Sequence, residues 1–323
     1  MTDHPVLSVQ KLDTRFQTQA GEIRAVDDVS FDLQKGEILG LVGESGSGKS
    51  VTGFSIMGLI DEPGRIHGGQ IRFKGEDLIN VDEKRYNRLR GREIAMIFQD
   101  PMMTLNPLLR IEVQMIEAIL AHEAVSRKVA RERAREALGM VGISSPDERL
   151  RAYPHQFSGG MRQRVVIAIS MLHAPDIIIA DEPTTALDVT IQAQILYEMQ
   201  KLRQNHGVSI IWITHDLSVI SALADRVCVM YAGTLVEQGS IDDVLDRPTH
   251  PYTEGLIQSV PNRNSIGERL SQIPGVIPTM IDPDPGCRFM KRCVYAKQKC
   301  ANGPAIVQLN DDRQVRCHYP LAH

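Results

Sequence analysis

The chain has 323 residues, 24% of them charged, with a net charge of −4 and five cysteines. This length allows one domain of about 200–250 residues and a smaller one. The weakly acidic balance excludes the global basic field of a typical nucleic-acid binder. No secretory-signal pattern opens the chain and no apolar run is long enough to span a membrane, so we expect a cytoplasmic protein without stable disulfides.

Short apolar runs in the first hundred residues predict strands. Residues 7–33 alternate β-like runs with polar turns, and EILGLVG at 37–43 is typical of a buried strand. GESGSGKS follows and leads into the helical stretch VTGFSIMGLI. Gly-rich turns separate strand-like pieces in residues 62–77, and IAMIFQDP at 94–101 predicts another buried strand.

The middle of the chain changes to helical periodicity. Residues 111–142 carry many charges at helical spacing and predict a helical insertion. After Ser158, helical and strand-like stretches alternate, which indicates a parallel sheet with crossover helices. From Ser240 onward proline becomes frequent and periodicity weakens, which indicates a small appended domain.

The segment GESGSGKS matches the phosphate-binding pattern G-x-x-x-x-G-K-[ST] between a strand and a helix. Its glycines let backbone N–H groups surround phosphate oxygens at a helix N-terminus. Lys49 can reach the β- and γ-phosphates, and the Ser50 hydroxyl can bind Mg²⁺. A chance Gly/Ser-rich loop would lack this strand and helix context. The predicted ATP contacts are Gly43, Ser45, Gly46, Gly48, Lys49, Ser50 and Val51.

A second acidic element completes the nucleotide chemistry. DIIIADEP ends an apolar run in Asp181 and Glu182. Asp181 is expected to hold Mg²⁺, and Glu182 to polarise an attacking water as a general base. Alone, such a pair is as often a helix cap or a surface turn. The phosphate loop favours the functional interpretation.

FSGGMRQR, at 157–164, resembles the signature of the ATP-binding cassette (ABC) ATPases, and the resemblance covers residues 7–240. It implies that Gln99 senses Mg²⁺, that His215 contacts the γ-phosphate, and that both act with Glu182 in catalysis. Ser50, Gln99 and Asp181 would hold Mg²⁺. In this family two cassettes pack head to tail, so a partner's ATP would meet Ser158, Gly159, Gly160, Gln163 and Asp188.

The resemblance also implies the fold. We expect an α/β P-loop NTPase cassette at 1–240, with a RecA-like parallel sheet core, an antiparallel β subdomain and a helical subdomain at about 102–165. Residues 241–323 would form an irregular C-terminal extension with a metal cluster. Phe16 is the candidate for stacking on adenine, although it is equally typical of a core residue.

ABC ATPases include translation factors, chromosome ATPases and transporter subunits. A translation factor would carry two cassettes, and a chromosome ATPase would carry a long heptad arm; a transporter ATPase fits the single cassette. DRPTHPYTEGLIQSVP, at 246–261, resembles dipeptide/oligopeptide importer ATPases, with nickel or another small solute as the alternative cargo. The resemblance implies a non-identical second ATPase, two separate permeases, an extracytoplasmic binding protein, peripheral attachment to the inner membrane and no nucleic-acid partner.

The last forty residues hold four of the five cysteines, Cys287, Cys293, Cys300 and Cys317. Structural zinc sites usually show one tight C-x₂₋₄-C hook, which is missing, whereas a [4Fe–4S] cluster accepts wider loops. Spacing alone leaves Zn²⁺ and the cluster nearly even; the family resemblance implies the iron–sulfur cluster. Six cations are expected either to offset thiolate charge or merely to solvate the loops: Arg288, Lys291, Arg292, Lys297, Lys299 and Arg316.

Two further residues complete the cysteine analysis. Cys228 alternates with apolar residues and is expected to be a small core residue. His318 is a substitute candidate for a metal ligand. With little apolar periodicity after residue 260, the tail is expected to need a metal centre in order to fold.

Overall fold

The structure is a computed structural model that describes residues 4–185, 187–260, 272–310 and 312–322. Ala186, two residues before the predicted ATP contact Asp188, and Pro261, the last residue of the importer-like segment, lie outside these ranges. The chain divides into two compact units, one of Met1–Asn80 with Trp212–His323 and one of Val81–Ile211. The cassette boundary expected near residue 240 stays a prediction.

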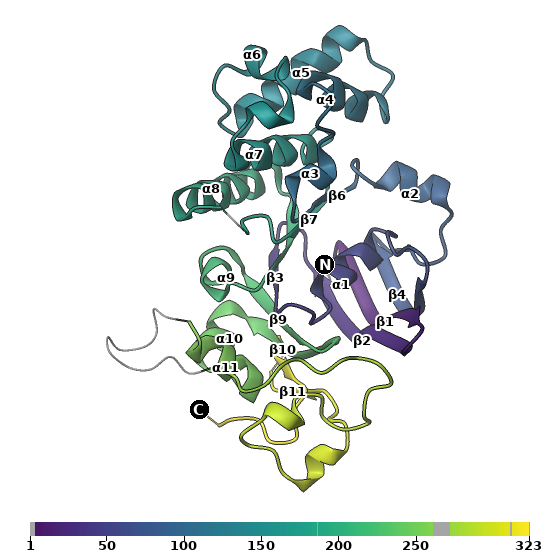
Figure 1. The fold of residues 1–323 in the computed structure, drawn as a ribbon, viewed down its shortest axis with the longest axis vertical. Helices are drawn as coiled ribbons and strands as arrows, with labels where there is room; N and C mark the ends of the chain where they lie inside the picture. The colour runs from purple at the N-terminus through teal and green to yellow at the C-terminus, as the bar shows by residue number, and fades with distance from the viewer. Residues whose placement is uncertain (1–3, 186, 261–271, 311, 323) are drawn as a thin grey trace. The chain divides into compact units, whose positions relative to one another are not determined.

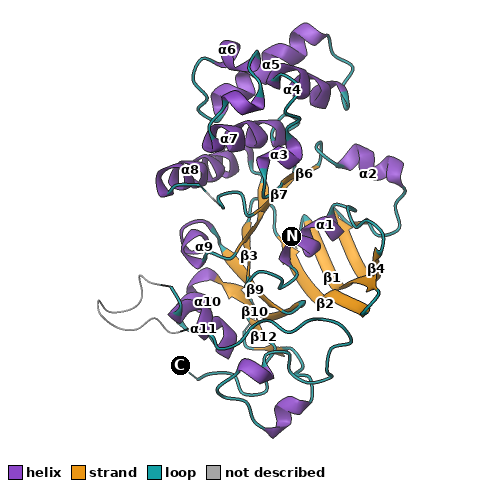
Figure 2. Ribbon diagram, in the orientation of Figure 1, coloured by secondary structure: helices purple, strands orange, loops and turns teal. Residues whose placement is uncertain are grey.

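The first unit contains an antiparallel sheet with the strand order β2-β1-β4-β5 (Figure 2). Its strands are β1 (Leu7–Thr18), β2 (Gly21–Leu33), β4 (Gly64–Phe73) and β5 (Glu76–Asp77). Leu7 opposes Leu33 on one side and Phe73 on the other, and all three side chains are buried. Alternating apolar residues therefore form the antiparallel β subdomain that the sequence predicts.

A second set of strands in the same unit begins with β3 (Ile38–Val42), in which every residue is buried. It pairs in parallel with β9 (Arg226–Tyr231), and β10 (Thr234–Ser240) pairs antiparallel with β9. Two short strands of the extension, β12 (Gln314–Val315) and β11 (Val307–Gln308), continue the sheet beyond β10. The helices of this unit are α1 (Lys49–Ile56), α9 (Leu217–Leu223), α10 (Ile241–Asp246) and α11 (Pro251–Gln258).

The second unit contains the parallel pair β6 (Ile94–Ile97) and β7 (Ile177–Asp181), both buried throughout. Strand β8 (Ser209–Thr214) crosses from this unit into the first along the chain. Helix α5 packs against α4, α6 and α7 (Figure 1). The helices are α2 (Glu83–Leu89), α3 (Pro101–Thr104), α4 (Ile111–Leu120), α5 (Arg127–Met140), α6 (Pro146–Leu150), α7 (Gly159–Ser170) and α8 (Val189–His206).

The predicted helical insertion is confirmed, but as separate helices rather than one stretch over 111–142. Helix α4 ends at Leu120, and Ser126 begins α5 by accepting a hydrogen bond from the Val129 amide at 3.3 Å. An N-cap serine stabilises a helix start because it satisfies an amide that has no partner within the helix.

The described part of the extension is mostly irregular, as its composition predicts. After helices α10 and α11, its described residues form the short 3₁₀ turns η3 (Met290–Arg292) and η4 (Gln298–Ala301) and the strands β11 and β12. Across the described ranges, no helix combines the length and apolar character needed to cross a membrane.

Candidate nucleotide-binding site

The phosphate loop has a backbone that requires glycine at two of its positions. Gly43 has φ +154°, and a Cβ atom there would lie 2.1 Å from the Met230 carbonyl oxygen. Gly48 has φ +103°, and its Cβ would lie 2.3 Å from the Ala25 carbonyl oxygen. Both carbonyls belong to neighbouring strands, so a side chain could enter only if the backbone moved. The loop is therefore shaped by its packing against β2 and β9.

Lys49 lies inside this loop. Its side chain is 4% exposed, and Nζ donates hydrogen bonds to the carbonyls of Gly43 at 2.8 Å and Glu44 at 3.0 Å. Ser45 and Gly46 form the exposed crown of the loop, and Ser50 and Val51 lie in the first turn of helix α1, which begins at Lys49. A buried cation at a helix N-terminus makes the loop suited to phosphate.

In the second unit, two predicted catalytic residues lie together. The Gln99 Nε2 atom donates a hydrogen bond to Glu182 Oε2 at 3.2 Å, and the Thr185 hydroxyl donates to the same oxygen at 2.9 Å. Glu182 has φ +46°, a left-handed conformation that is unfavourable for a residue with a side chain. Such strain persists where the surrounding structure imposes it, often at functional sites.

The predicted magnesium ligands are chemically suitable. The Ser50 hydroxyl, the Gln99 amide oxygen and the Asp181 carboxylate are hard oxygen donors of the kind that Mg²⁺ binds. Asp181 is 4% exposed at the end of β7. Ser50 belongs to the first unit, whereas Gln99 and Asp181 belong to the second.

The signature segment begins helix α7. The Ser158 side chain is exposed and caps the helix by accepting a hydrogen bond from the Met161 amide at 3.3 Å. Gly159 is exposed, whereas a Cβ atom on Gly160 would lie 2.5 Å from Ile191 Cγ2 on α8. Gly160 thus has a packing role that the sequence did not reveal. Gln163 is 1% exposed, and its contact with a partner's ATP stays a prediction.

Three other predicted residues have these places. Asp188 caps α8 by accepting a hydrogen bond from the Ile191 amide at 3.0 Å, and His215 is exposed directly after β8. Phe16 is half-buried on β1, with its ring against Gly64 of β4. The structure gives Phe16 a packing contact, and its stacking on adenine stays a prediction.

Comparisons with known proteins agree with this geometry. Residues 26–185 match the "ABC transporter" family model, and residues 236–300 match "Oligopeptide/dipeptide transporter, C-terminal region". The dipeptide transport ATP-binding protein DppD of Escherichia coli is 47% identical over 317 residues, covering 98% of this chain and 97% of that protein. The chain belongs to the ABC dipeptide/oligopeptide transport ATPases.

Two further relatives support the assignment. DppD of Bacillus subtilis is 52% identical over 314 residues, covering 97% of this chain and 94% of that protein. The solved cassette MJ0796, in a dimeric post-hydrolysis state with ADP and Pi, has a TM-score of 0.65 and 27% identity. The match covers 73% of this chain and 98% of the MJ0796 chain. This dipeptide/oligopeptide transport ATPase is an ATP-hydrolysing subunit, and the nickel alternative is not favoured.

The C-terminal cysteines differ from their prediction. All five cysteines are free thiols, and no three His, Cys, Asp or Glu side chains in the described ranges are arranged to hold a metal ion. The predicted C-terminal metal-cluster domain is therefore not supported by the described residues. Burial raises the pKa of Cys287, Cys293 and Cys317, the last to about 11, and neighbouring thiols add to each rise.

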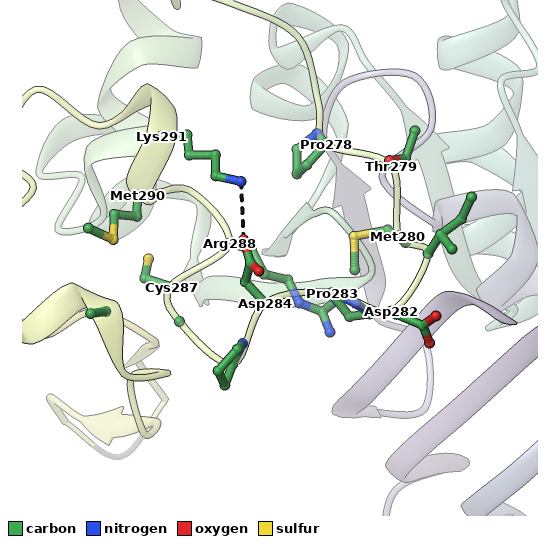
Figure 3. A pocket seen from close by; sticks show the side chains of 14 residues that line it. Pro278, Thr279, Met280, Asp282, Pro283, Asp284, Cys287, Arg288, Met290 and Lys291 are labelled. Atoms are coloured by element: carbon green, nitrogen blue, oxygen red, sulfur yellow. Dashed lines mark hydrogen bonds and ion pairs between the residues drawn. The ribbon is translucent and has the colours of Figure 1, made fainter. Parts of the chain in front are cut away.

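The cations near these cysteines have other partners. Arg288 binds the Asp27 carboxylate and the Ala232 carbonyl, and Arg316 binds Asp28 at 2.8 Å. Arg292 binds Glu44. The expectation that these arginines serve thiolates or merely solvate loops is thus wrong, because the carboxylates of the cassette bind them. Lys291 pairs with Asp284 beside a pocket of about 570 Å³ that Cys287 also lines (Figure 3).

The two remaining thiol-related predictions have different outcomes. Cys228 is fully buried on β9, and burial raises its pKa to about 12, which confirms the core role. The His318 ring contacts the Asn302 carbonyl oxygen at 2.9 Å, so its role as a substitute ligand gains no support.

Sequence reasoning missed the residues that attach the extension to the phosphate loop. These are Tyr252, in the HPYT segment, and Arg292, and both contact Glu44. The HPYT segment was noted only as a family mark. Its meaning here is structural, because the buried His250 ring accepts a hydrogen bond from the Tyr252 amide at 3.0 Å and so begins α11.

Proposed function

We propose that the loop at 43–50 binds the phosphates of ATP and that Glu182 activates the water that hydrolyses it. The observation that carries this proposal is the shape of the loop, in which packed glycines and the buried Lys49 are already in place. The energy of hydrolysis would drive import of dipeptides or oligopeptides through separate permeases.

Each predicted residue has a chemical role in this scheme. Lys49 offsets charge on the β- and γ-phosphates. Ser50, Gln99 and Asp181 would hold Mg²⁺, which neutralises phosphate charge when bound. Glu182 accepts a proton from water as the phosphorus–oxygen bond breaks, and His215 holds the γ-phosphate. Phe16 stacks on adenine.

The partner cassette supplies the opposite side of each ATP. Ser158, Gly159, Gly160, Gln163 and Asp188 of one chain act on the nucleotide of the other, and ATP closes this head-to-tail pair. We propose a non-identical second ATPase, two permeases at the inner membrane, and an extracytoplasmic binding protein that delivers peptide. The support for these partners is the family membership and the dimeric state of the cassette MJ0796.

Two substitutions in the assembled transporter test the chemistry. Glu182→Gln is expected to lower ATP hydrolysis about 10²–10⁴-fold with ATP binding retained, because only proton transfer is lost. Lys49→Ala is expected to abolish ATP binding. Glu148→Gln, on the exposed helix α6, is the control and should match the wild type. Equal hydrolysis rates for Glu182→Gln and wild type would show that Glu182 is not the base.

The four extension cysteines carry a separate proposal, that they bind a [4Fe–4S] cluster, with Zn²⁺ as the alternative. Its support is their spacing, the family resemblance, and the proximity of two of them, since the Cys287 amide donates a hydrogen bond to the Cys300 carbonyl at 2.8 Å. Binding requires the thiols to rearrange and lose protons. An anaerobic visible spectrum with metal analysis decides the matter: colourless protein with one zinc overturns the cluster, and metal-free protein overturns both.

A further inference from the structure

The C-terminal extension holds the phosphate loop at Glu44. Its backbone amide donates a hydrogen bond to the Tyr252 hydroxyl at 2.9 Å. Its carboxylate accepts two hydrogen bonds from Arg292 NH1, at 3.0 and 3.2 Å, and one from NH2 at 3.2 Å. Tyr252 lies in α11 and Arg292 in η3, so both sets of hydrogen bonds come from outside the phosphate-loop motif.

Arg292 is fixed on several sides. Its side chain is 6% exposed, Nε donates to the Pro274 carbonyl at 2.7 Å, and NH1 lies 3.4 Å from the Tyr231 hydroxyl. The guanidinium also lies 5.7 Å from the centre of the Tyr231 ring. A guanidinium that is bound in this way makes a directional pair with a carboxylate, and little motion is left to it.

Tyr252 is fixed equally firmly. Its side chain is fully buried, with ring centres 4.6 Å from Tyr231 and 5.4 Å from Phe289. Burial raises the pKa of its hydroxyl, so the neutral form accepts the Glu44 amide proton. Phe289 belongs to the cysteine-rich segment and contacts both tyrosines, which joins that segment to α11.

Glu44 is connected to the part of the loop that binds phosphate. Its carbonyl accepts a hydrogen bond from Lys49 Nζ at 3.0 Å, and it also accepts one from the Ser47 amide at 3.2 Å. The next two residues, Ser45 and Gly46, are exposed. A shift of Glu44 therefore moves the crown of the loop and the lysine together.

We propose that Arg292 and Tyr252 are positioning residues for the nucleotide site. They hold Glu44 so that the crown of the loop and Lys49 keep the arrangement that binds phosphate. Arg292 also neutralises a carboxylate that would otherwise repel the polyphosphate. This inference rests on the proposed function of the loop in ATP binding, and it makes the extension a determinant of nucleotide affinity.

The test uses the assembled transporter and measures the Kd of a fluorescent ATP analogue together with KM and kcat for ATP. Arg292→Met is expected to raise Kd and KM about tenfold, while kcat changes less than about twofold. Tyr252→Phe, which removes one hydroxyl, is expected to raise Kd about threefold. In Arg292→Met/Glu44→Gln, affinity recovers toward that of Glu44→Gln alone, because the unpaired carboxylate is gone.

The matched control is Lys291→Met, next to Arg292. It makes the same change of charge at an ion pair with Asp284 whose side chains are 81% and 79% exposed, so Kd should stay at the wild-type value. If Arg292→Met fails to fold, the Kd of Tyr252→Phe still tests the inference. Wild-type Kd in folded Tyr252→Phe, or no recovery in the double variant, overturns the inference. If Lys49→Ala binds the analogue as the wild type does, the proposed function fails instead.

Discussion

The phosphate loop and the C-terminal extension of this ATPase differ in how much of their structure a short stretch of sequence reveals. In the loop, the pattern that sets the backbone lies between Gly43 and Ser50. In the extension, Arg292, Arg288 and Arg316 bind carboxylates 248, 261 and 288 positions away in the chain. The residue types that the loop requires therefore form a short motif, even though their packing partners Met230 and Ala25 lie elsewhere in the chain, whereas the arginine contacts of the extension belong to no short motif.

The difference explains why one prediction was confirmed and the other was not. The glycines, the lysine and the helix start of the loop occur at fixed spacing, so the motif can be recognised without knowledge of its packing partners. The positions of four thiols depend on how an irregular chain packs, and spacing says little about that. Three long-range arginine contacts hold the extension without the described residues forming a metal-binding group.

The largest expected effect is on stability and concerns an ion pair of the C-terminal extension. The Glu237 side chain is fully buried, and it accepts hydrogen bonds from Thr249, the His250 amide and Arg313 at 2.7–2.9 Å. Glu237→Gln leaves Arg313 as a buried, unpaired cation, which should lower the free energy of unfolding by about 3–5 kcal/mol. Chemical denaturation measures the change.

A double variant is the control for this prediction. Glu237→Gln/Arg313→Met removes both charges and should recover much of the lost stability, because no buried charge stays unpaired. If the double variant is no more stable than Glu237→Gln, the ion pair is not what attaches the extension strand β12 to β10.

The next largest effect concerns the phosphate loop. In Gly43→Ala the new Cβ meets the Met230 carbonyl, so the loop must move and ATP affinity should fall about a hundredfold. Gly75→Ala is the matched control, because Gly75 has φ +86° but no atom within 4 Å of the added Cβ. It should cost about 1–2 kcal/mol of stability for the left-handed backbone and leave affinity unchanged. Similar affinities for both variants would show that packing against Met230 does not shape the loop.

The smallest effect is a dependence of the free energy of unfolding on pH, through His250 at the start of α11. Burial lowers the pKa of His250 to about 4, from an ordinary value of 6.5. The folded state thus favours neutral His250, so its stabilisation is complete above pH 6.5 and is lost as the pH falls toward 4. At pH 5 the loss should be about 2 kcal/mol.

His250→Asn removes this titration but keeps a side-chain acceptor that can begin α11. The free energy of unfolding, measured from pH 7 to pH 4.5, should then fall less steeply than in the wild type. Parallel curves for the two proteins would show that His250 does not report on the junction.

Several elements could be predicted from the chain and others could not. Strands β3 and β7 and the helical insertion follow from apolar runs and helical periodicity. The family resemblance implied that Gln99 and Glu182 act together in catalysis, but their hydrogen bond, between residues 83 positions apart, came only from the structure. Strands β11 and β12, with two residues each, carry no periodicity that could be recognised. The sequence predicted Gly160 as part of an anion site, but its contact with Ile191 depends on how α7 packs against α8 and could not be predicted.

By itself, the sequence determined the phosphate loop, the acidic strand end and membership of a transport ATPase family, because each depends on residue types at short, fixed spacing. The tertiary structure alone decided that Tyr252 and Arg292 meet at Glu44. Buried polar groups must find partners when the chain folds, and the available partners are set by packing rather than by distance along the chain.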